Sequence, residues 1–182
     1  MHRHTFKNQR HHWIGKSIAF IVHLSFLLNF RRIVMRFLPF LKLQSRVRNI
    51  VYLSWLIDID QVRSRYPQSV KLLEKQNKTI FTILTYQHEH FGFSFLEWFR
   101  KLMPSPKQSN WRFYIDPIQQ EKTVIFEQVI VDQMLYVLSG RLASDAMPAQ
   151  LAKPFEHLVQ DQKIHTALTV DQYNLINFKI SI

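Results

Sequence analysis

The pattern of apolar and polar positions changes near residue 48. Upstream, residues 17–30 (SIAFIVHLSFLLNF) form one apolar run that is closed by Arg31 and Arg32. Downstream, short runs rich in branched and aromatic residues predict strands. These runs cover residues 48–58, 69–74, 78–90, 110–115, 123–130, 163–170 and 173–182. Helical spacing predicts helices over residues 95–103, 132–142 and 146–158, and a short helix from about Asp60 that ends before Pro67.

This order of elements predicts an α+β fold. Strands interrupted by a few helices are typical of a mostly antiparallel β-barrel or cone-like sheet with flanking helices. Gln76 and Asn77 are turn-forming residues between two strand-like runs, which indicates a hairpin. We therefore expect one domain over residues 46–182 and a basic, apolar, helical N-terminal extension over residues 1–45. The apolar run NFKISI at the end of the chain leaves it open whether the domain is C-terminally complete.

Charge separates the extension from the domain. The first 57 residues contain ten Lys or Arg and no Asp or Glu, whereas the rest of the chain contains fourteen cations and thirteen anions. Of the formal charge of +11, the first 57 residues therefore carry +10 and the rest of the chain carries about +1. A nucleic-acid-binding domain carries its cations on a folded face, so this distribution disfavours nucleic acid as a partner.

The extension itself has two parts. Residues 1–16 are polar, basic and histidine-rich, and we expect them to form a mobile arm. As a helix, the apolar run would extend roughly 20 Å, short of the ~30 Å hydrocarbon core of a bilayer. Three interpretations remain open: a helix at an anionic membrane surface or a signal anchor, a helix packed on the domain or a partner, and an over-long start with little structure. No signal-peptide cleavage site follows the run, and we expect a cytoplasmic protein, with membrane association as the alternative.

The composition excludes several classes of functional site. With only three glycines (Gly15, Gly92 and Gly140), the chain has no phosphate-binding loop of the GxGxxG or P-loop type. Without cysteine, it has no disulfide, no thiolate metal site, no iron–sulfur cluster and no cysteine nucleophile.

The stretch YQHEHFG (86–92) raises the question of a metal site. In a strand, Tyr86, His88 and His90 lie on one face and Glu89 on the other. Further metal ligands would have to come from His157, His165, Asp132 and Asp145. The histidines are interpreted as residues that line a pocket, with metal ligation and a structural role at a strand end as alternatives. We expect no metal and no cofactor.

A second candidate site lies in residues 110–115. Alternation places Asn110, Arg112 and Tyr114 on one face and Trp111 and Phe113 on the other. An inward-facing arginine beside a tyrosine would clamp a carboxylate, because the guanidinium matches its two oxygens. The alternative is a surface arginine paired with a glutamate.

Arg141 completes the candidate set. It lies in GRLASDAMP, where Asp145 is interpreted as a helix cap or as the ionic partner of Arg141. The candidate ligand-binding residues are Tyr86, His88, His90, Asn110, Arg112, Tyr114 and Arg141.

Several segments resemble a known family. NIVYLSWLIDIDQVRSRYP, TIFTILTYQHEHFG, PSPKQSNWRFYI and GRLASDAMP occur in the order found in the uncharacterised bacterial YqjF-like family of the acetoacetate decarboxylase-like superfamily. The resemblance covers roughly residues 46–160 and not the N-terminal extension. It implies a barrel or cone-like sheet around an internal cavity, with small organic acids as ligands.

The resemblance also bears on catalysis. The best-known enzyme of the superfamily uses a lysine Schiff base activated by a neighbouring lysine, whereas this chain has no Lys-Lys pair. Lys78 and Lys122 are expected to face solvent. We therefore expect a protein that binds a small anionic organic molecule, with catalysis undecided and a decarboxylase-like lyase as the first activity to test. The alternative is a membrane-surface interaction or scaffold protein that acts through residues 1–45.

Overall fold

The structure is a computed structural model that describes residues 43–116, 123–143, 147–169 and 175–181. The predicted mobile arm and apolar helix of the N-terminal extension lie outside the described residues. The elements, in chain order, are β1 (Leu43–Asp58), α3 (Asp60–Arg63), β2 (Glu74–Lys75), β3 (Lys78–Phe93), α4 (Glu97–Arg100), β4 (Lys107–Tyr114), β5 (Val124–Val131), α5 (Met134–Ala143), β6 (Ala149–Leu151), β7 (Phe155–Gln160), β8 (Lys163–Thr169) and β9 (Leu175–Ser181). No helix within these residues is long and apolar enough to cross a bilayer.

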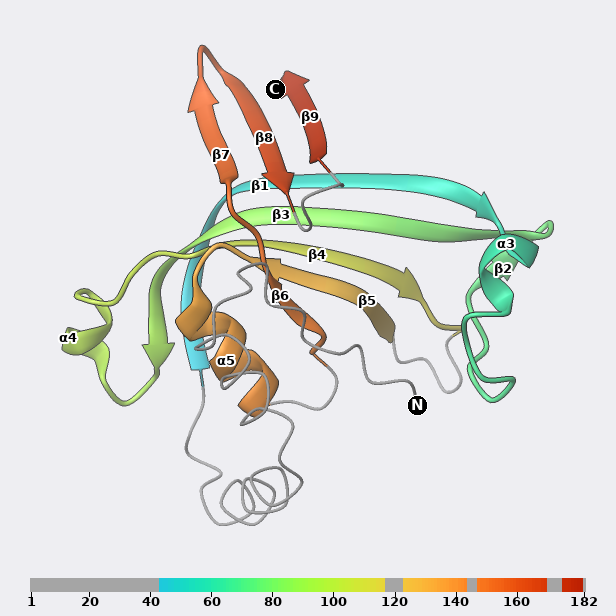
Figure 1. Ribbon diagram of the computed structural model, residues 1–182, viewed down its shortest axis with the longest axis horizontal. Coiled ribbons are helices and arrows are strands. Elements are labelled where there is room, and N and C mark those ends of the chain that lie inside the picture. The colour runs from blue at the N-terminus through green and yellow to red at the C-terminus, as the bar shows by residue number, and fades with distance from the viewer. Residues whose placement is uncertain (1–42, 117–122, 144–146, 170–174, 182) are drawn as a thin grey trace, which may run out of the picture.

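The large sheet has the strand order β1-β3-β4-β5-β6, and the short β2 also pairs with β3. Its pairs are antiparallel except for β5 and β6, which are parallel. The sheet curls but does not close, because β1 and β6 remain as its two edges (Figure 1). The α+β fold with a cone-like sheet is therefore confirmed, and the closed barrel is not.

Two bulges help to bend the long strands β1 and β3. The register of β1 and β3 shifts between Arg48 and Val51, where β1 carries one extra residue. It shifts again between Gln44 and Arg46, where the extra residue lies on β3. Asn49 and His90 lie at these shifts with φ of 52° and 51°. A bulge leaves one residue unpaired, bends the strand and increases its twist, which is consistent with the arch over the concave face.

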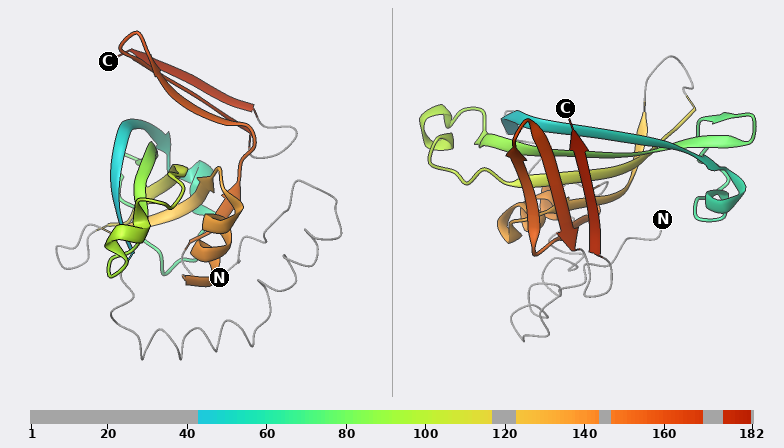
Figure 2. Two further views of the ribbon diagram at one scale, coloured as in Figure 1. Left: turned by 90° about the vertical axis from the view of Figure 1, so that its left-hand side faces the viewer. Right: turned by 90° about the horizontal axis from the view of Figure 1, so that it is seen from above.

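The large sheet has a different cover on each face. Helix α5 lies under the concave face, and the three-stranded sheet β7-β8-β9 lies over the convex face (Figures 1 and 2). Between α5 and the concave face, Val129 and Val131 of β5 pack with Tyr136 and Val137 of α5. On the convex face, one apolar cluster contains Ile130, Ala152, Phe155, Leu168 and Trp111, and another contains Ile59, Val62, Leu72, Phe113 and Phe81.

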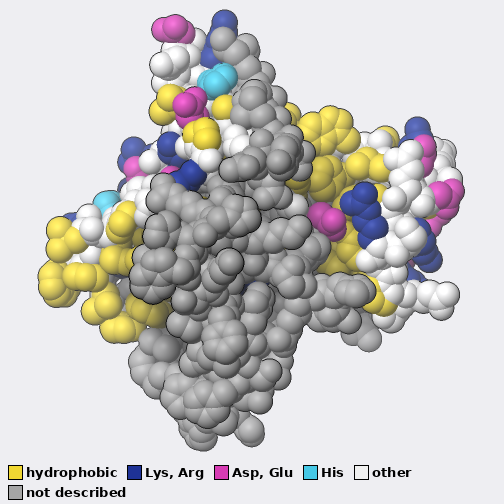
Figure 3. Space-filling view, in the orientation of Figure 1, with side chains coloured by type: hydrophobic (Ala, Val, Ile, Leu, Met, Phe, Trp, Pro, Cys, Tyr) yellow, Lys and Arg dark blue, Asp and Glu magenta, His cyan; other side chains and the backbone are white. Residues whose placement is uncertain are grey.

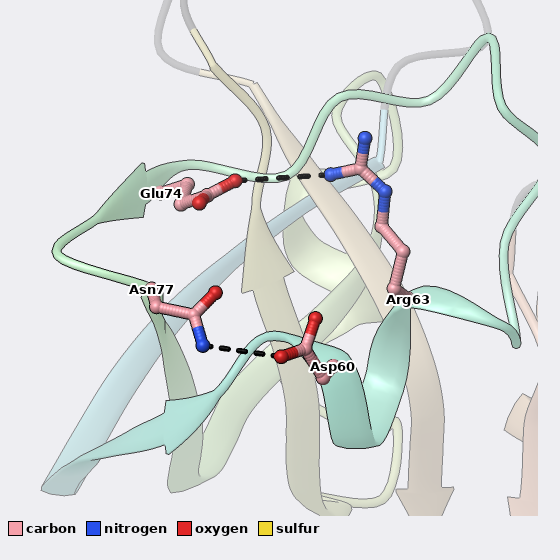
Figure 4. A network of polar contacts seen from close by, with 4 residues as sticks. All are labelled: Asp60, Arg63, Glu74 and Asn77. Carbon is pink, nitrogen blue, oxygen red and sulfur yellow. Dashed lines mark hydrogen bonds and ion pairs between the residues drawn. The ribbon is translucent and has the colours of Figure 1, made fainter.

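The hairpin predicted at Gln76 and Asn77 is confirmed. Both residues have positive φ, at 52° and 60°, and they join β2 to β3. Figure 4 shows how this turn is tied to α3: Asn77 donates a hydrogen bond to Asp60 at 3.1 Å, and Arg63 lies 3.9 Å from Glu74.

Two helix predictions need correction. Residues 146–158 do not form a helix within the described part of that range, because β6 pairs with β5 and β7 pairs with β8. Pro148 and Pro154 lack a backbone N–H, and a proline inside a helix removes a hydrogen bond and clashes with the preceding turn. The helix expected over residues 95–103 is also shorter, since α4 spans only Glu97–Arg100.

Candidate polar site on the concave face

A row of polar side chains follows β4 along the concave face. Gln108, Asn110, Arg112 and Tyr114 alternate with Ser109, Trp111 and Phe113, which face the convex side. The row lies beside Tyr86 and His88 of β3, because Tyr86 pairs with Gln108 in the register. From Gln108 to Arg112 the row extends about 13 Å at the usual rise per strand residue.

One half of the row is a continuous hydrogen-bond chain. His88 Nδ1 lies 2.8 Å from Ser45 Oγ, and His88 Nε2 lies 2.8 Å from Gln108 Oε1. The Gln108 amide donates to Asn110 Oδ1 at 2.7 Å, and the Asn110 amide donates to the Tyr86 hydroxyl at 3.0 Å. Because Gln108 Oε1 can only accept, His88 carries its proton on Nε2 and accepts from Ser45.

This direction of donation matters for Tyr86. Its oxygen accepts from Asn110, so its own O–H is left to donate, and no acceptor among the described side chains takes that proton. Burial raises the pKa of Tyr86, although its hydrogen bond to Asn110 and the charge of Arg112 act in the opposite direction. The network therefore presents Tyr86 as a neutral hydrogen-bond donor on the concave face.

The other half of the row is centred on Arg112. Arg112 Nη2 lies 3.4 Å from the hydroxyls of both Tyr52 and Tyr114, and its guanidinium carbon lies 5.7 and 5.5 Å from the centres of their rings. The two phenols also hydrogen-bond to each other. The hydrogen bond from Tyr114 lowers the pKa of Tyr52, against burial, and Arg112 adds to this lowering.

Arg112 lacks an acidic partner within the described residues. Its Nε is buried without a hydrogen-bond partner, and the ion pairs there involve the other arginines Arg48, Arg63 and Arg65. Burial acts to lower the pKa of Arg112, but the two tyrosines outweigh it and raise the pKa. The guanidinium is thus a fixed cation with an unused donor. The side chains of Tyr52, Tyr86, Asn110, Arg112 and Tyr114 are called the Arg112 site below.

A small cavity lies beside the same face, between the sheet and α5. Its volume is about 80 Å³, and its lining includes His88, Gln108, Phe91, Val129, Tyr136 and Gly140. Burial lowers the pKa of His88, although Gln108 acts against this shift, so His88 is neutral at pH 7. This space, called the His88 cavity, has a mostly apolar wall and one polar corner.

The structure brings together five of the seven residues predicted from the sequence. Tyr86, His88, Asn110, Arg112 and Tyr114 share the concave face, as strand alternation predicts; whether they bind a ligand stays a prediction.

His90 and Arg141 lie apart from this row. His90 lies in the bulge of β3, where its positive φ interrupts the alternation, and it is exposed. Arg141 is buried on α5, where its Nε donates to the carbonyl of Ala149 and burial lowers its pKa to about 10. Asp145, its expected partner, lies outside the described residues.

Within the described residues, His88 and His90 do not belong to a cluster of metal ligands. No group of three or more His, Asp or Glu side chains suited to a metal ion is present among the described residues. Glu89 points away from His88, as expected, and pairs with Arg48 at 2.6 Å.

Three residues of the site were missed in the sequence. Tyr52 and Ser45 come from β1, and only the pairing of β1 with β3 brings them to Arg112 and His88. Gln108 could have been found, because it alternates with Asn110 and Arg112 on the same strand.

Comparison with known proteins supports the fold. No protein-family model matches the chain, and no curated protein matches it. Among solved structures, it is similar to the enduracididine biosynthesis enzyme MppR complexed with pyruvate, with a TM-score of 0.52 and 12% sequence identity. The match covers 73% of this chain and 54% of that one, so this chain spans about half the length of MppR. This likeness concerns the fold alone, and the resemblance to the acetoacetate decarboxylase-like superfamily and its YqjF-like family stays a prediction.

Proposed function

We propose that the Arg112 site binds a small organic carboxylate. The observation that carries this proposal is the buried Nε of Arg112, which has no hydrogen-bond partner in a site where the described residues provide no carboxylate. A buried donor without a partner is costly, by about 1–3 kcal/mol and more for a charged group. A ligand that accepts hydrogen bonds and carries negative charge would balance the charge of this guanidinium.

The remaining groups of the site fit the same ligand. Tyr86 has an O–H free to donate. In the Tyr52–Tyr114 pair, one hydroxyl donates its proton to the other, so the accepting hydroxyl still has a proton to donate. A guanidinium with two phenolic donors matches the two oxygens of a carboxylate, since charge-assisted hydrogen bonds are roughly twice as strong as neutral ones.

Pyruvate is the first ligand to test. The similar structure MppR is described as complexed with pyruvate, and a site with one cation and several hydroxyl donors suits a small 2-oxo acid in general. The His88 cavity lies on the same face and would accommodate only a few non-hydrogen atoms at about 80 Å³.

Whether the ligand is converted is a separate question. Schiff-base chemistry needs a desolvated lysine, but Lys78 is exposed at the start of β3, and Lys107 faces the other side of the sheet, where its Nζ donates to Phe155 O at 3.2 Å. The proposal is therefore binding through Arg112 without a covalent lysine intermediate.

The test is calorimetric titration of pyruvate and related carboxylates into the wild type, Arg112→Met and Arg112→Lys. Arg112→Met should cost about 2–5 kcal/mol of binding, or at least ~30-fold in Kd. Arg112→Lys should recover part of this loss, because lysine keeps the charge without the fork. Arg46→Met is the matched control, since it removes an exposed arginine of β1 and should leave binding unchanged.

Two outcomes would contradict the proposal. Equal losses for Arg112→Met and Arg46→Met would show that only net charge matters. A borohydride-trapped pyruvate adduct on a lysine, lost in Lys78→Met or Lys122→Met, would replace the binding role with a Schiff-base enzyme.

The second proposed role concerns the N-terminal extension. Its dense positive charge favours an anionic membrane surface, at about 1 kcal/mol per basic residue near the lipid. Fractionation of the full-length protein and of a form without residues 1–42 tests this role, because β1 begins at Leu43. If removal of residues 1–42 leaves the fraction that sediments with anionic vesicles unchanged, the role is wrong.

A further inference from the structure

The end of β3 and α4 form an apolar protrusion from the large sheet. Figure 1 shows this segment extending beyond the strands, and Figure 3 shows hydrophobic side chains gathered there. Trp98 and Leu102 are 71% and 72% exposed. The exposed apolar residues are Phe93, Phe95, Trp98, Phe99 and Leu102, and together they are called the α4 protrusion. Contiguous exposed apolar patches mark interaction sites.

The protrusion is held in place from below. Arg100 Nε donates to the carbonyl of His90 at 2.8 Å, and its Nη1 donates to Gln44 Oε1 at 2.9 Å. Its side chain crosses Gly92, where a Cβ atom would lie only 2.9 Å from Arg100 Cγ. These contacts tie α4 to the ends of β1 and β3, so the aromatic rings are exposed by a defined conformation of the chain.

Two exposed cations lie near the base of the protrusion, and α4 also contains Glu97. Lys101 on α4 and Arg46 on β1 are exposed. Leu43 pairs with Phe93, so the N-terminal segment joins the sheet at the foot of the protrusion. Residues 1–42 contain eight Lys or Arg and no Asp or Glu. The described cations Lys101 and Arg46 and the large apolar side chains thus lie at the same end of the sheet.

We propose that the α4 protrusion docks on the surface of an anionic phospholipid bilayer. Tryptophan and phenylalanine favour the membrane–water interface, and apolar side chains next to Lys and Arg are typical of segments that bind anionic lipid without spanning the bilayer. This surface is distinct from the Arg112 site and does not depend on the carboxylate proposal.

Lipid suits the protrusion better than a second copy of the chain. Two copies would bring formal charges of +11 against each other, and self-repulsion of this kind opposes association. An anionic bilayer reverses the sign of that interaction, and a projecting group of side chains can enter the headgroup region without a complementary groove.

The test uses the absence of cysteine from the chain. Full-length Leu102→Cys, labelled with an environment-sensitive nitrobenzoxadiazole probe, is mixed with vesicles of phosphatidylglycerol and phosphatidylcholine. The probe should shift to the blue and be quenched by nitroxide-labelled lipid. Leu158→Cys is the matched control, because Leu158 is 47% exposed on β7 and should report neither change.

A second measurement does not rely on a probe. In vesicle sedimentation, Trp98→Ser/Phe99→Ser should bind anionic vesicles at least tenfold more weakly than the wild type. Leu158→Ser/Val159→Ser removes two apolar residues that are 47% and 48% exposed and should change binding less than twofold.

The inference would be overturned by absence of vesicle binding, by binding that leaves the Leu102 probe unquenched, or by equal partitioning of the two double variants. A blue shift that depends on protein concentration and needs no lipid would assign the protrusion to self-association instead.

Discussion

The two faces of the large sheet use the same strands for different purposes. On β4, Phe113 is 2% exposed and packs in a convex-face cluster, while the neighbouring Arg112 and Tyr114 are only half-buried on the concave face. Adjacent residues of one strand thus lie in a closed core and in an open polar site.

The faces also differ in how their polar groups are satisfied. On the convex side, the hydroxyls of Thr85 and Ser109 bond to each other at 2.8 Å, and Trp111 donates to the same Ser109. On the concave side, the chain of donors ends at Tyr86 and Arg112 with donor capacity left over. The convex side is not fully paired either, since Thr79 Oγ1 and Gln128 Oε1 are buried without a hydrogen-bond partner. The concave side differs in that its unused donor belongs to the cation Arg112.

The largest expected effect tests the role of the convex face in stability. Phe113→Ala should lower the free energy of unfolding by about 3–5 kcal/mol, because it leaves a cavity in a closed core. Arg112→Met, at the neighbouring residue, should change the free energy of unfolding by no more than about 1 kcal/mol. Urea denaturation measures both. Comparable losses would remove the distinction between the two faces.

The next effect is a dependence of stability on pH. Burial lowers the pKa of His88 and of His157 below the ordinary 6.5. The unfolded chain then binds more protons below pH 6.5, so stability is complete above that pH and falls as the pH decreases, by up to about 1.4 kcal/mol per histidine and pH unit. Burial raises the pKa of Asp132 above 3.8, which acts in the opposite direction at lower pH.

Replacement of one histidine separates the two contributions. His157 is 2% exposed and bonds to Thr166 and to the carbonyl of Asn49, both at 2.7 Å. His157→Leu should reduce the slope of unfolding free energy between pH 5 and 6.5 by up to half. An unchanged slope would mean that the lowered pKa of His157 does not govern acid stability.

A smaller effect should appear in binding alone. Tyr86→Phe removes a single neutral donor from the Arg112 site, so carboxylate affinity should fall by about 0.5–1.5 kcal/mol while the melting temperature barely changes. Tyr66→Phe is the control, because Tyr66 donates to Glu127 away from this site. If both variants bind the ligand like the wild type, Tyr86 is not part of the site.

No effect is expected from metal removal. Both ring nitrogens of His88 are engaged by Ser45 and Gln108, so chelation should leave the melting temperature unchanged. Loss of a structural metal would instead cost several kcal/mol. Stoichiometric zinc or iron in the purified protein, together with a lower melting temperature after chelation, would reverse this interpretation.

Local periodicity was sufficient for the parts of the fold and site that lie on regular strands. The alternation over residues 107–114 places Asn110, Arg112 and Tyr114 on one face, because a strand turns its side chains to opposite sides at every residue. The same rule separates Glu89 from His88, and the Gln76–Asn77 turn is a local feature of two residues that accept positive φ.

The sequence by itself therefore determined the fold class, the polar row of β4 and the cationic N-terminal segment, all of which depend on neighbours in the chain. Tertiary structure decided the rest. Tyr52 meets Arg112 across 60 residues through strand pairing, the bulge at His90 removes it from the row, and residues 149–151 form a strand since β5 offers them partners. Such contacts depend on which distant segment supplies the hydrogen bonds, and local periodicity carries no information on that choice.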